Sequence, residues 1–355
     1  MKRIIQLLAG YTNGDAISNH ARALQKLFRS WGHESLITAP RQHVHHKLRG
    51  TMPGMEELDF REGDVVILHL SIGGKVNEVF ASLTQCKRAI IYHNITPPEY
   101  FRGLNNEICS VLELGLEHVK MLAGVADVNM AVSQFNAGEL VKIGYDKVDV
   151  VPLVIQLREM DRAPSQTTLK DFDDDLTNIL FVGRVAPNKC IDDLICAFYY
   201  YQKYHNPNSR LHLIGASSAT PFYYQGLLQQ VMTLGAENVH FSGFTSDKAL
   251  RAYYQMSDLF LCMSEHEGVC IPLLEAMHVN MPVLAYAAAA IPETMDGAGV
   301  LTHEKHWPSI AAMMDEMIRN QGFRDHVIEG QNKRMARYQD QNLEAKLKQS
   351  LAPIL

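Results

Sequence analysis

Short, uninterrupted apolar runs recur along this chain, and segments with helical spacing separate them. Four of these runs span residues 3–9, 64–69, 88–93 and 178–182. A strand that is apolar at successive positions is buried on both faces, as in a parallel sheet covered by helices. Neighbouring parallel strands also need a crossover connection, which a helix supplies. The pattern therefore predicts an α/β fold with doubly wound, Rossmann-like sheets.

The strand–helix–strand pattern occurs twice, which predicts two domains. It begins at residues 3–9 and begins again at 178–182, and a charged, polar stretch over 156–177 separates the two halves. A chain of 355 residues is long enough for two domains of ordinary size. We predict one domain over residues 1–158 and a second over 159–337, followed by a C-terminal helix.

Composition narrows the functional classes. The hydrophobic fraction of 47% suits two globular cores, and the net charge of −6 gives no overall attraction to nucleic acid. The six cysteines form no C-x-x-C pair and no zinc spacing, which favours reduced thiols in an intracellular protein. The first strand begins directly after the initial residues, so we expect no secretory signal, and no apolar run is long enough to span a membrane.

The stretch 264–277 predicts an anion-binding site. It follows a buried run, contains the glycine Gly268, and leads into Pro272, a residue tolerated at the first position of a helix. A strand, a tight loop and a helix N-terminus in this order present free N–H groups to a phosphate. Glu267 would lie in the loop and Glu275 about one turn into the helix, so both carboxylates could face one ligand.

A second loop predicts a diphosphate site. Gly183 follows the strand at 178–182, and Arg184 and Lys189 stand five positions apart on the same loop. Arginine binds phosphate through its planar fork and lysine as a point charge. Two such cations at the carboxyl end of a strand are suited to a diphosphate, although a solvated surface loop is the alternative.

Two features of the first half are candidates for ligand contacts. Gly14 follows the first strand and allows close approach of a ligand to the backbone, unless it is only a turn glycine. His93 ends the run 88–93 and precedes a polar loop, a position where parallel sheets place ligand groups. A dinucleotide site is disfavoured because the first loop lacks G-x-G-x-x-G and the second strand ends without an acidic residue.

Two charged segments have weaker functional interpretations. Residues 41–50 are basic and rich in histidine, and we interpret them as a solvated loop, with contact to a phosphate-bearing acceptor or an anionic membrane surface as the alternative. Residues 173–175 are three aspartates in a row, which match the D-x-D pattern that one class of sugar transferase uses to hold a metal–diphosphate. They precede a strand and lie in a polar linker, so we interpret them as a solvated charge run.

Taken together, the motifs resemble the GT-B glycosyltransferases of family four. The resemblance covers nearly the whole chain and rests on the shared order and spacing of its motifs. In the second half they are Gly-Arg-(x)4-Lys from Gly183, Glu-(x)7-Glu from Glu267, and residues 181–184, 239–244, Ser264, 272–276 and 292–293. In the first half they are Gly14, Gly32-His33, His93 and Ser133.

The resemblance implies roles for these residues. Arg184 and Lys189 would neutralise the departing diphosphate, Glu267 would bind hydroxyls of the donor sugar, and Glu275 the ribose diol. Further donor contacts would come from Gly14, Gly183, Gly268 and the amides of Val269, Cys270 and Ile271. His93 would lie beside the reacting sugar, so His93, Arg184, Lys189 and Glu267 form the expected catalytic set. Cys190 departs from the family pattern, which usually has glycine after the lysine.

The family also implies a reaction and a setting. The expected reaction is sugar transfer from a nucleotide-diphosphate sugar with retention at the anomeric carbon, without cofactor or metal. The first domain would bind the acceptor and the second the nucleotide sugar, on either side of a central cleft, with residues 338–355 packing back on the first domain. The stretch 92–101 resembles bacterial polysaccharide and lipopolysaccharide mannosyltransferases, which favours GDP-mannose and a glycan or lipid-linked acceptor. We therefore expect a cytoplasmic protein that contacts the inner membrane peripherally.

Four alternatives remain open from the sequence. The nearest is a transferase of the same fold that uses a UDP-sugar. A glycosidase could use Glu267 and Glu275 as acid and nucleophile but would have no use for Arg184 and Lys189. A sugar-nucleotide epimerase and a non-catalytic partner in glycan assembly are the other two.

Overall fold

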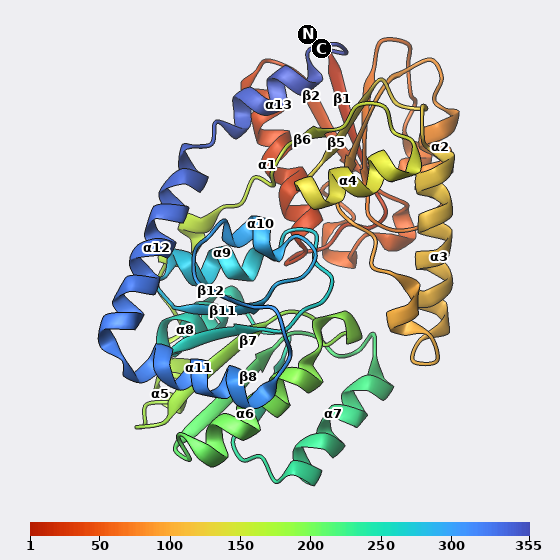
Figure 1. Cartoon of the computed structure of the whole chain (residues 1–355). Coiled ribbons are helices and arrows are strands. Elements are labelled where there is room, and N and C mark those ends of the chain that lie inside the picture. The colour runs from red at the N-terminus through yellow and green to blue at the C-terminus, as the bar shows by residue number, and fades with distance from the viewer. The chain divides into compact units, whose positions relative to one another are not determined.

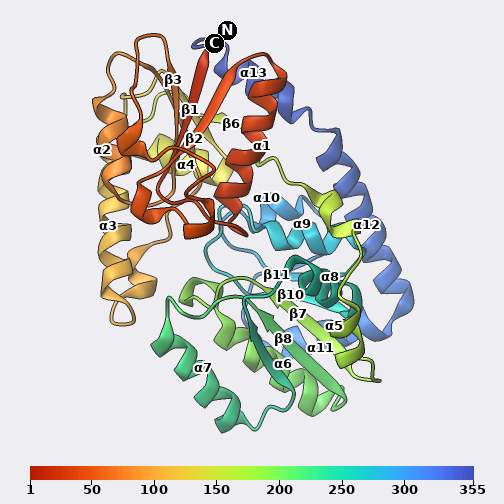
Figure 2. The same ribbon diagram turned by 180° about the vertical axis from the view of Figure 1, so that it is seen from behind.

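The structure, a computed structural model, describes residues 1–355 and separates into two compact units. The first unit comprises Met1–Glu99, Asn106–Ile155 and Asn342–Leu355, and the second comprises Tyr100–Asn105 and Gln156–Gln341. Each unit contains one parallel six-stranded sheet flanked by helices (Figures 1 and 2). The predicted α/β class with two doubly wound sheets is confirmed.

The sheet of the first unit has the strand order β2-β1-β3-β4-β5-β6. Its strands are β1 (Arg3–Leu8), β2 (Glu34–Thr38), β3 (Val65–Leu70), β4 (Lys87–Tyr92), β5 (Val128–Ala131) and β6 (Asp149–Val150). Ile5 of β1 lies opposite Leu36 on one side and Val66 on the other. All six residues of β3 are buried, which explains the unbroken apolar run seen in the sequence.

Five helices belong to this unit: α1 (Ala16–Ser30), α2 (Lys75–Ser82), α3 (Asn106–Met121), α4 (Gln134–Ile143) and α13 (Leu343–Leu351). Asp15 caps α1 by accepting a hydrogen bond from the N–H of Ser18, and Ser133 caps α4 by accepting one from the N–H of Asn136. The C-terminal helix α13 packs within this unit. Trp31 donates a hydrogen bond of 2.8 Å to Glu344, and the Lys348 ammonium lies over the indole ring.

The sheet of the second unit has the order β12-β11-β10-β7-β8-β9. Its strands are β7 (Thr177–Val182), β8 (Ser209–Ile214), β9 (Val239–Gly243), β10 (Leu259–Cys262), β11 (Val283–Tyr286) and β12 (Val300–Thr302). Leu180 of β7 pairs with Phe260 of β10 on one side and His212 of β8 on the other. Numbered from β7, this is the order 3-2-1-4-5-6 of dinucleotide-binding domains, and its direction reverses between β7 and β10.

Eight helices surround this sheet: α5 (Gln166–Asp171), α6 (Ile191–Tyr204), α7 (Pro221–Leu234), α8 (Asp247–Met256), α9 (Ile271–His278), α10 (Ile291–Met295), α11 (Trp307–Arg319) and α12 (Gln321–Asp340). Short 3-10 helices cover Arg41–His43, His46–Leu48, Met55–Glu57, Pro98–Phe101, Leu157–Asp161 and Pro187–Lys189. The core lies where α6 and α11 pack on the sheet. Phe198, Tyr201 and Met314 are fully buried there.

Two elements differ from their sequence predictions. The apolar spacing of the sequence predicts a helix over residues 112–126. In the structure α3 begins at Asn106 and ends at Met121, and Gly124 follows with a φ of 76° that no helix continues through. The apolar run over residues 148–154 predicts a strand of that length, but β6 has only two residues at the sheet edge. Pro152 lacks the N–H that a longer ladder would need.

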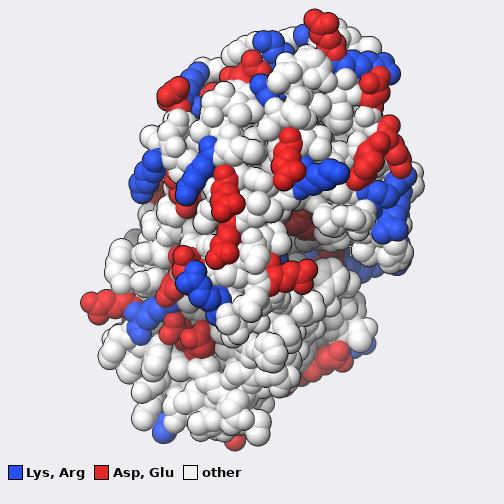
Figure 3. All heavy atoms as spheres, turned by 90° about the vertical axis from the view of Figure 1, so that its right-hand side faces the viewer, with Lys and Arg blue, Asp and Glu red and all other residues white.

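The surface gives two further observations. None of the helices is both long enough and apolar enough to cross a bilayer. On the face drawn in Figure 3, basic and acidic side chains are interspersed rather than gathered into a field of one sign. That face therefore offers no extended basic track of the kind that binds nucleic acid.

Candidate functional site

The strongest candidate site of the second unit lies where its strand order reverses. The loop after β7 contains Gly183, Arg184 and Lys189, and the loop after β10 leads to Glu267 and the start of α9. In open α/β sheets, ligands bind outside the carboxyl ends of the two strands at this reversal. The two loops that were singled out separately in the sequence are therefore brought together at the position where this fold binds ligands.

Close backbone packing shapes the first of these loops. Gly215, just after β8, has a φ of 152°, and a Cβ atom added there would lie only 1.9 Å from the carbonyl oxygen of Gly183. A side chain at Gly215 would push the backbone of Gly183 and Arg184 out of place. Gly215 was not among the predicted residues, because a single glycine after a strand gives no signal of what lies beside it.

Gly215→Ala is expected to destabilise the protein by about 1–3 kcal/mol, the usual cost of a strained backbone site. Urea unfolding measures this cost. The matched control is Gly226→Ala on α7, where nothing lies within 4 Å of the added Cβ and alanine favours the helix. Equal stability of the two variants would contradict the close approach of residues 183 and 215.

Lys189 and Glu267 form an ion pair across the two loops. Lys189 Nζ lies 2.6 Å from Glu267 Oε1, and their side chains are 17% and 12% exposed. The sequence predicted separate roles for them, on phosphate and on sugar, without predicting this contact. Arg184 is exposed on the same loop. A cation and a carboxylate held side by side can bind a ligand that carries both phosphate and hydroxyl groups.

Asn188 joins the two loops through hydrogen bonds. Its side-chain amide donates a 3.0 Å hydrogen bond to the carbonyl of His266, and its own carbonyl accepts one of 3.0 Å from the N–H of Glu265. Asn188 is buried. These bonds place Lys189 next to Glu267 before any ligand binds. The sequence signalled neither contact, because both join residues more than 70 positions apart.

Two cysteines occupy left-handed backbone positions at the starts of helices. Cys190 precedes α6 with a φ of 47°, and Cys270 precedes α9 with a φ of 63°. This conformation costs a non-glycine residue roughly 1–2 kcal/mol. The conformation is one that glycine, which the resemblance implies at the position of Cys190, would adopt without this cost. The turn at Cys270 directs the chain into α9, where Pro272 occupies the first turn as predicted.

The turn before α9 presents backbone donors. The N–H groups of Val269, Cys270 and Ile271 donate no hydrogen bonds within the structure. Thr294 holds the loop from the other side by donating a hydrogen bond to the carbonyl of Val269. With Gly268 beside them, these amides form the N-terminal end of a helix that attracts an anion.

Glu275 lies one turn into α9 without a cation beside it. Tyr254 of α8 donates a 2.8 Å hydrogen bond to Glu275 Oε2. Burial raises the pKa of Glu275, and the tyrosine hydrogen bond offsets only part of this rise. A buried carboxylate with one hydroxyl partner retains acceptor capacity for further donors. Tyr254 was missed, since its helix carries no motif.

A second ion network supports the loop after β10. Lys305 Nζ lies 2.7 Å from both Asp193 and Glu265, Trp307 donates to Asp193, and Tyr100 donates to Glu265. Burial lowers the pKa of Lys305, but its hydrogen bonds to the two carboxylates outweigh this and raise it overall. The chain itself thus provides the positive charge at this acidic pair. None of these contacts was predicted.

In the first unit, His93 follows β4 at the carboxyl end of the sheet, as predicted. Its Nε2 atom lies 2.9 Å from Nδ1 of His69, which stands on β3. Burial lowers the pKa of both imidazoles well below the usual range. Gly14 lies in the loop after β1 with a φ of 75°, a conformation that favours glycine.

The charged segments have mixed outcomes. Asp174 is not merely solvated, because it forms a 2.5 Å ion pair with Arg210 and accepts a hydrogen bond from the N–H of Leu176. All three aspartates are exposed, so residues 173–175 agree with the predicted solvated charge run apart from this pairing of Asp174. The basic loop 41–50 is largely exposed, and the carbonyl of His43 accepts a hydrogen bond from Tyr11 beside the first-strand loop.

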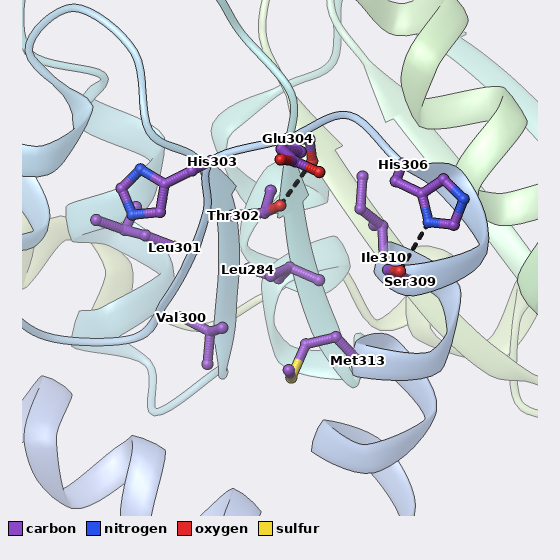
Figure 4. Close-up of a pocket in the computed structure, with 10 residues that line it drawn as sticks. All are labelled: Leu284, Val300, Leu301, Thr302, His303, Glu304, His306, Ser309, Ile310 and Met313. Carbon is purple, nitrogen blue, oxygen red and sulfur yellow. Dashed lines mark hydrogen bonds between the residues drawn. The ribbon is translucent and has the colours of Figure 1, made fainter.

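A pocket of about 380 Å³ opens elsewhere in the second unit (Figure 4). It is lined by apolar side chains of β11, β12 and α11 and by His303, Glu304, His306 and Ser309. His306 bonds to Ser309, and Thr302 donates to the carbonyl of Glu304. None of the predicted site residues lines this pocket, so it does not belong to the candidate site.

Comparison with known proteins shows what the second half of the chain resembles. Residues 169–334 match the family described as "Glycosyl transferases group 1". An uncharacterized glycosyltransferase of Methanocaldococcus jannaschii is 30% identical over 45% of this chain and 40% of its own length. O-antigen chain mannosyltransferase B of Escherichia coli is 24% identical over 41% of this chain and 38% of its own. The chain thus spans about two fifths of the length of these two curated relatives.

The solved structures extend the likeness to the whole fold. HepE of Anabaena, in complex with UDP and glucose, superposes with a TM-score of 0.74 at 18% identity, covering 99% of this chain and 100% of HepE. At this identity the match concerns the fold, and it includes both parallel six-stranded sheets. Residues 169–334 are therefore similar to group 1 glycosyltransferases, and the chain as a whole has the two-sheet GT-B fold.

Proposed function

We propose that this protein transfers a sugar from a nucleotide-diphosphate sugar to a hydroxyl of a glycan or lipid-linked acceptor, with retention at the anomeric carbon and without a metal. The observation that carries the proposal is the pairing of Lys189 with Glu267 at the strand-order reversal, next to the start of α9. A cation, a carboxylate and free amides there suit a ligand with phosphates and hydroxyls.

The roles of the residues follow from the chemistry of sugar transfer. Cleavage of the donor leaves a negative diphosphate and an oxocarbenium-like sugar. Lys189, Arg184 and the amides of residues 269–271 stabilise the diphosphate, which is usually the largest catalytic contribution. Glu267 accepts hydrogen bonds from the donor sugar. In the first unit, His93 and the Gly14 loop are proposed to bind sugar hydroxyls.

Glu275 is assigned to the ribose of the nucleotide. Its buried carboxylate has the acceptor capacity to bind two vicinal hydroxyls, with Tyr254 holding its orientation. Lys305 forms ion pairs with both Asp193 and Glu265, so this acidic pair needs no added cation. The diphosphate would be neutralised by side chains and amides rather than by a metal.

Nucleotide affinity is expected to depend on the protonation of Glu275. The carboxylate form accepts the ribose hydrogen bonds, so affinity is full above the raised pKa of Glu275 and weakens as the pH falls through it. Calorimetric titration with a nucleoside diphosphate across this pH range measures the effect. Glu275→Gln is the matched control, because phosphate titration contributes equally to both proteins. Identical pH profiles would contradict the ribose role.

GDP-mannose is the favoured donor, and a UDP-sugar is the alternative. The similarity to a mannosyltransferase acting on O-antigen chains supports the first, and the UDP complex of HepE keeps the second open. Thermal shift with GDP, UDP and their sugars separates the two. Stabilisation by GDP and GDP-mannose is expected, and stabilisation by UDP without GDP would overturn the mannose assignment.

The free state of all six cysteines supports a cytoplasmic setting for the proposed reaction. Peripheral contact with the inner membrane is part of the same proposal.

A further inference from the structure

A chain of hydrogen bonds runs through the interior of the first unit to His93. It starts at the carbonyl of Ala21 on α1, which accepts a 3.0 Å bond from the side-chain amide of Gln6 on β1. Gln6 Oε1 lies 3.0 Å from His69 Nε2, and His69 Nδ1 lies 2.9 Å from His93 Nε2. Gln6 and His69 are buried, and His93, the last residue in this series of hydrogen bonds, is half-buried.

The direction of every bond in this chain follows from its first member. A backbone carbonyl only accepts, so the Gln6 atom facing Ala21 must be the NH₂ group and the atom facing His69 must be the oxygen. His69 Nε2 must then carry a proton and donate it. A neutral imidazole carries one proton, so His69 Nδ1 is bare and accepts from His93 Nε2–H. The remaining nitrogen of His93, Nδ1, is left as an acceptor.

The surroundings keep these imidazoles neutral. Burial lowers the pKa of His20 to about 3, and it lowers those of His69 and His93 well below the usual range. His20 packs edge-on against both other rings, at centroid distances of 5.8 and 5.5 Å. Neither ring nitrogen of His20 has a hydrogen-bond partner, so His20 takes no part in this series of hydrogen bonds.

The three histidines also invite comparison with a metal site, since their nitrogens lie within 4.8 Å of one another. Two imidazole nitrogens bound tetrahedrally to one zinc ion at roughly 2.0–2.1 Å stand about 3.4 Å apart. The His69–His93 separation of 2.9 Å is that of a hydrogen bond instead. The geometry therefore favours a proton between these nitrogens over a metal ion.

We propose that Gln6 and His69 are positioning residues that fix His93 as the Nε2–H tautomer, so that its Nδ1 atom accepts a hydrogen bond from a substrate hydroxyl. The part of this proposal that concerns the substrate rests on the proposed function. The tautomer itself is a property of the free protein. A backbone carbonyl on α1 thus decides whether His93 acts as an acceptor or a donor toward its ligand.

The test is ¹⁵N NMR of the histidine side chains in the free full-length protein, with the His93 signals assigned by their loss in His93→Gln. The expected result is a neutral His93 protonated on Nε2 and bare on Nδ1. A proton on Nδ1, an imidazolium at neutral pH, or one equivalent of zinc in elemental analysis of the purified protein would each overturn the proposal.

Two substitutions of Gln6 test the origin of the tautomer. Gln6→Met keeps the shape of the side chain but removes the acceptor for His69 Nε2–H, so the chain is expected to reverse and move the His93 proton to Nδ1. Gln6→Glu retains an acceptor toward His69 and is expected to keep the native tautomer. His20→Leu is the matched control, because the lost nitrogens make no hydrogen bond. An unchanged His93 tautomer in folded Gln6→Met would overturn the role of Gln6.

Kinetics separates this proposal from the proposed function. Gln6→Met is expected to lower kcat about tenfold while nucleoside-diphosphate affinity, which depends on the second unit, stays unchanged, and Gln6→Glu is expected to restore most of the rate. Absence of transfer by the wild-type protein with every donor would count against the proposed function and leave the tautomer result standing. Wild-type kcat in a tautomer-reversed Gln6→Met would overturn the acceptor role of Nδ1.

Discussion

Lys189→Ala is expected to lower sugar transfer at least tenfold, which corresponds to about 1.4 kcal/mol of lost transition-state stabilisation. Lys189 would meet the negative charge that grows on the leaving diphosphate, so the loss should appear in kcat as well as in kcat/KM. The substitution also leaves Glu267 without its partner at 2.6 Å, and the freed carboxylate would then repel the phosphate. Steady-state kinetics of the purified variant measures the effect.

The control for Lys189→Ala is Lys333→Ala on α12. Lys333 also pairs with a glutamate at 2.6 Å, but both side chains are well exposed and their helix carries no predicted site residue. Loss of that pair should leave both stability and transfer nearly unchanged. Thermal melting of both variants shows whether the fold is intact. Wild-type transfer in a folded Lys189→Ala protein would refute the assignment of Lys189 to the leaving group.

Glu275→Ala is expected to weaken nucleoside-diphosphate binding at least tenfold and to lower transfer to a similar extent. The substitution removes the acceptor proposed for the ribose diol, and hydrogen bonds to charged groups contribute about 1.5–3 kcal/mol each. Titration calorimetry measures the affinity. Glu275→Gln keeps a partner for the Tyr254 hydroxyl, so it separates loss of the ribose contact from loss of packing.

Glu329→Gln on α12 is the matched control for the loss of one carboxylate, because Glu329 is exposed and pairs only with Lys333. It should bind nucleotide as the wild type does. If Glu275→Ala bound the nucleotide with unchanged affinity while remaining folded, Glu275 would have a structural role through Tyr254 and the ribose assignment would be wrong.

Much of the fold could be predicted from the sequence, because parallel strands buried on both faces leave continuous apolar runs. β3 and β7 were visible for this reason, and so was the helix start at Pro272. The ends of α3 and β6 were wrong, because the helical pattern continues past Gly124 and the strand pattern past Pro152. The backbone conformation at Gly124 and the missing N–H at Pro152 override the apolar pattern.

The candidate site was predicted only in part. Lys189 and Glu267 were named from local motifs, but their ion pair joins residues 78 positions apart, which no local pattern reveals. Tyr254, Asn188 and Lys305 escaped notice for the same reason, since each acts through a partner distant in sequence. The motifs thus predicted side chains for ligand contact, whereas the residues that position those side chains can be recognised only in the three-dimensional structure.

The most direct test of the central claim is donor turnover followed by ¹H NMR, with the purified full-length protein and a panel of GDP- and UDP-sugars. Without its acceptor, a retaining transferase is expected to hydrolyse its own donor slowly. The prediction is release of nucleoside diphosphate and of free sugar that first appears with the anomeric configuration of the donor, and both products should fall at least tenfold in Lys189→Ala. First-formed sugar of inverted configuration, or equal release by Lys189→Ala, would contradict the mechanism. Neither binding nor turnover of any nucleotide sugar across the panel would contradict the assignment as a glycosyltransferase.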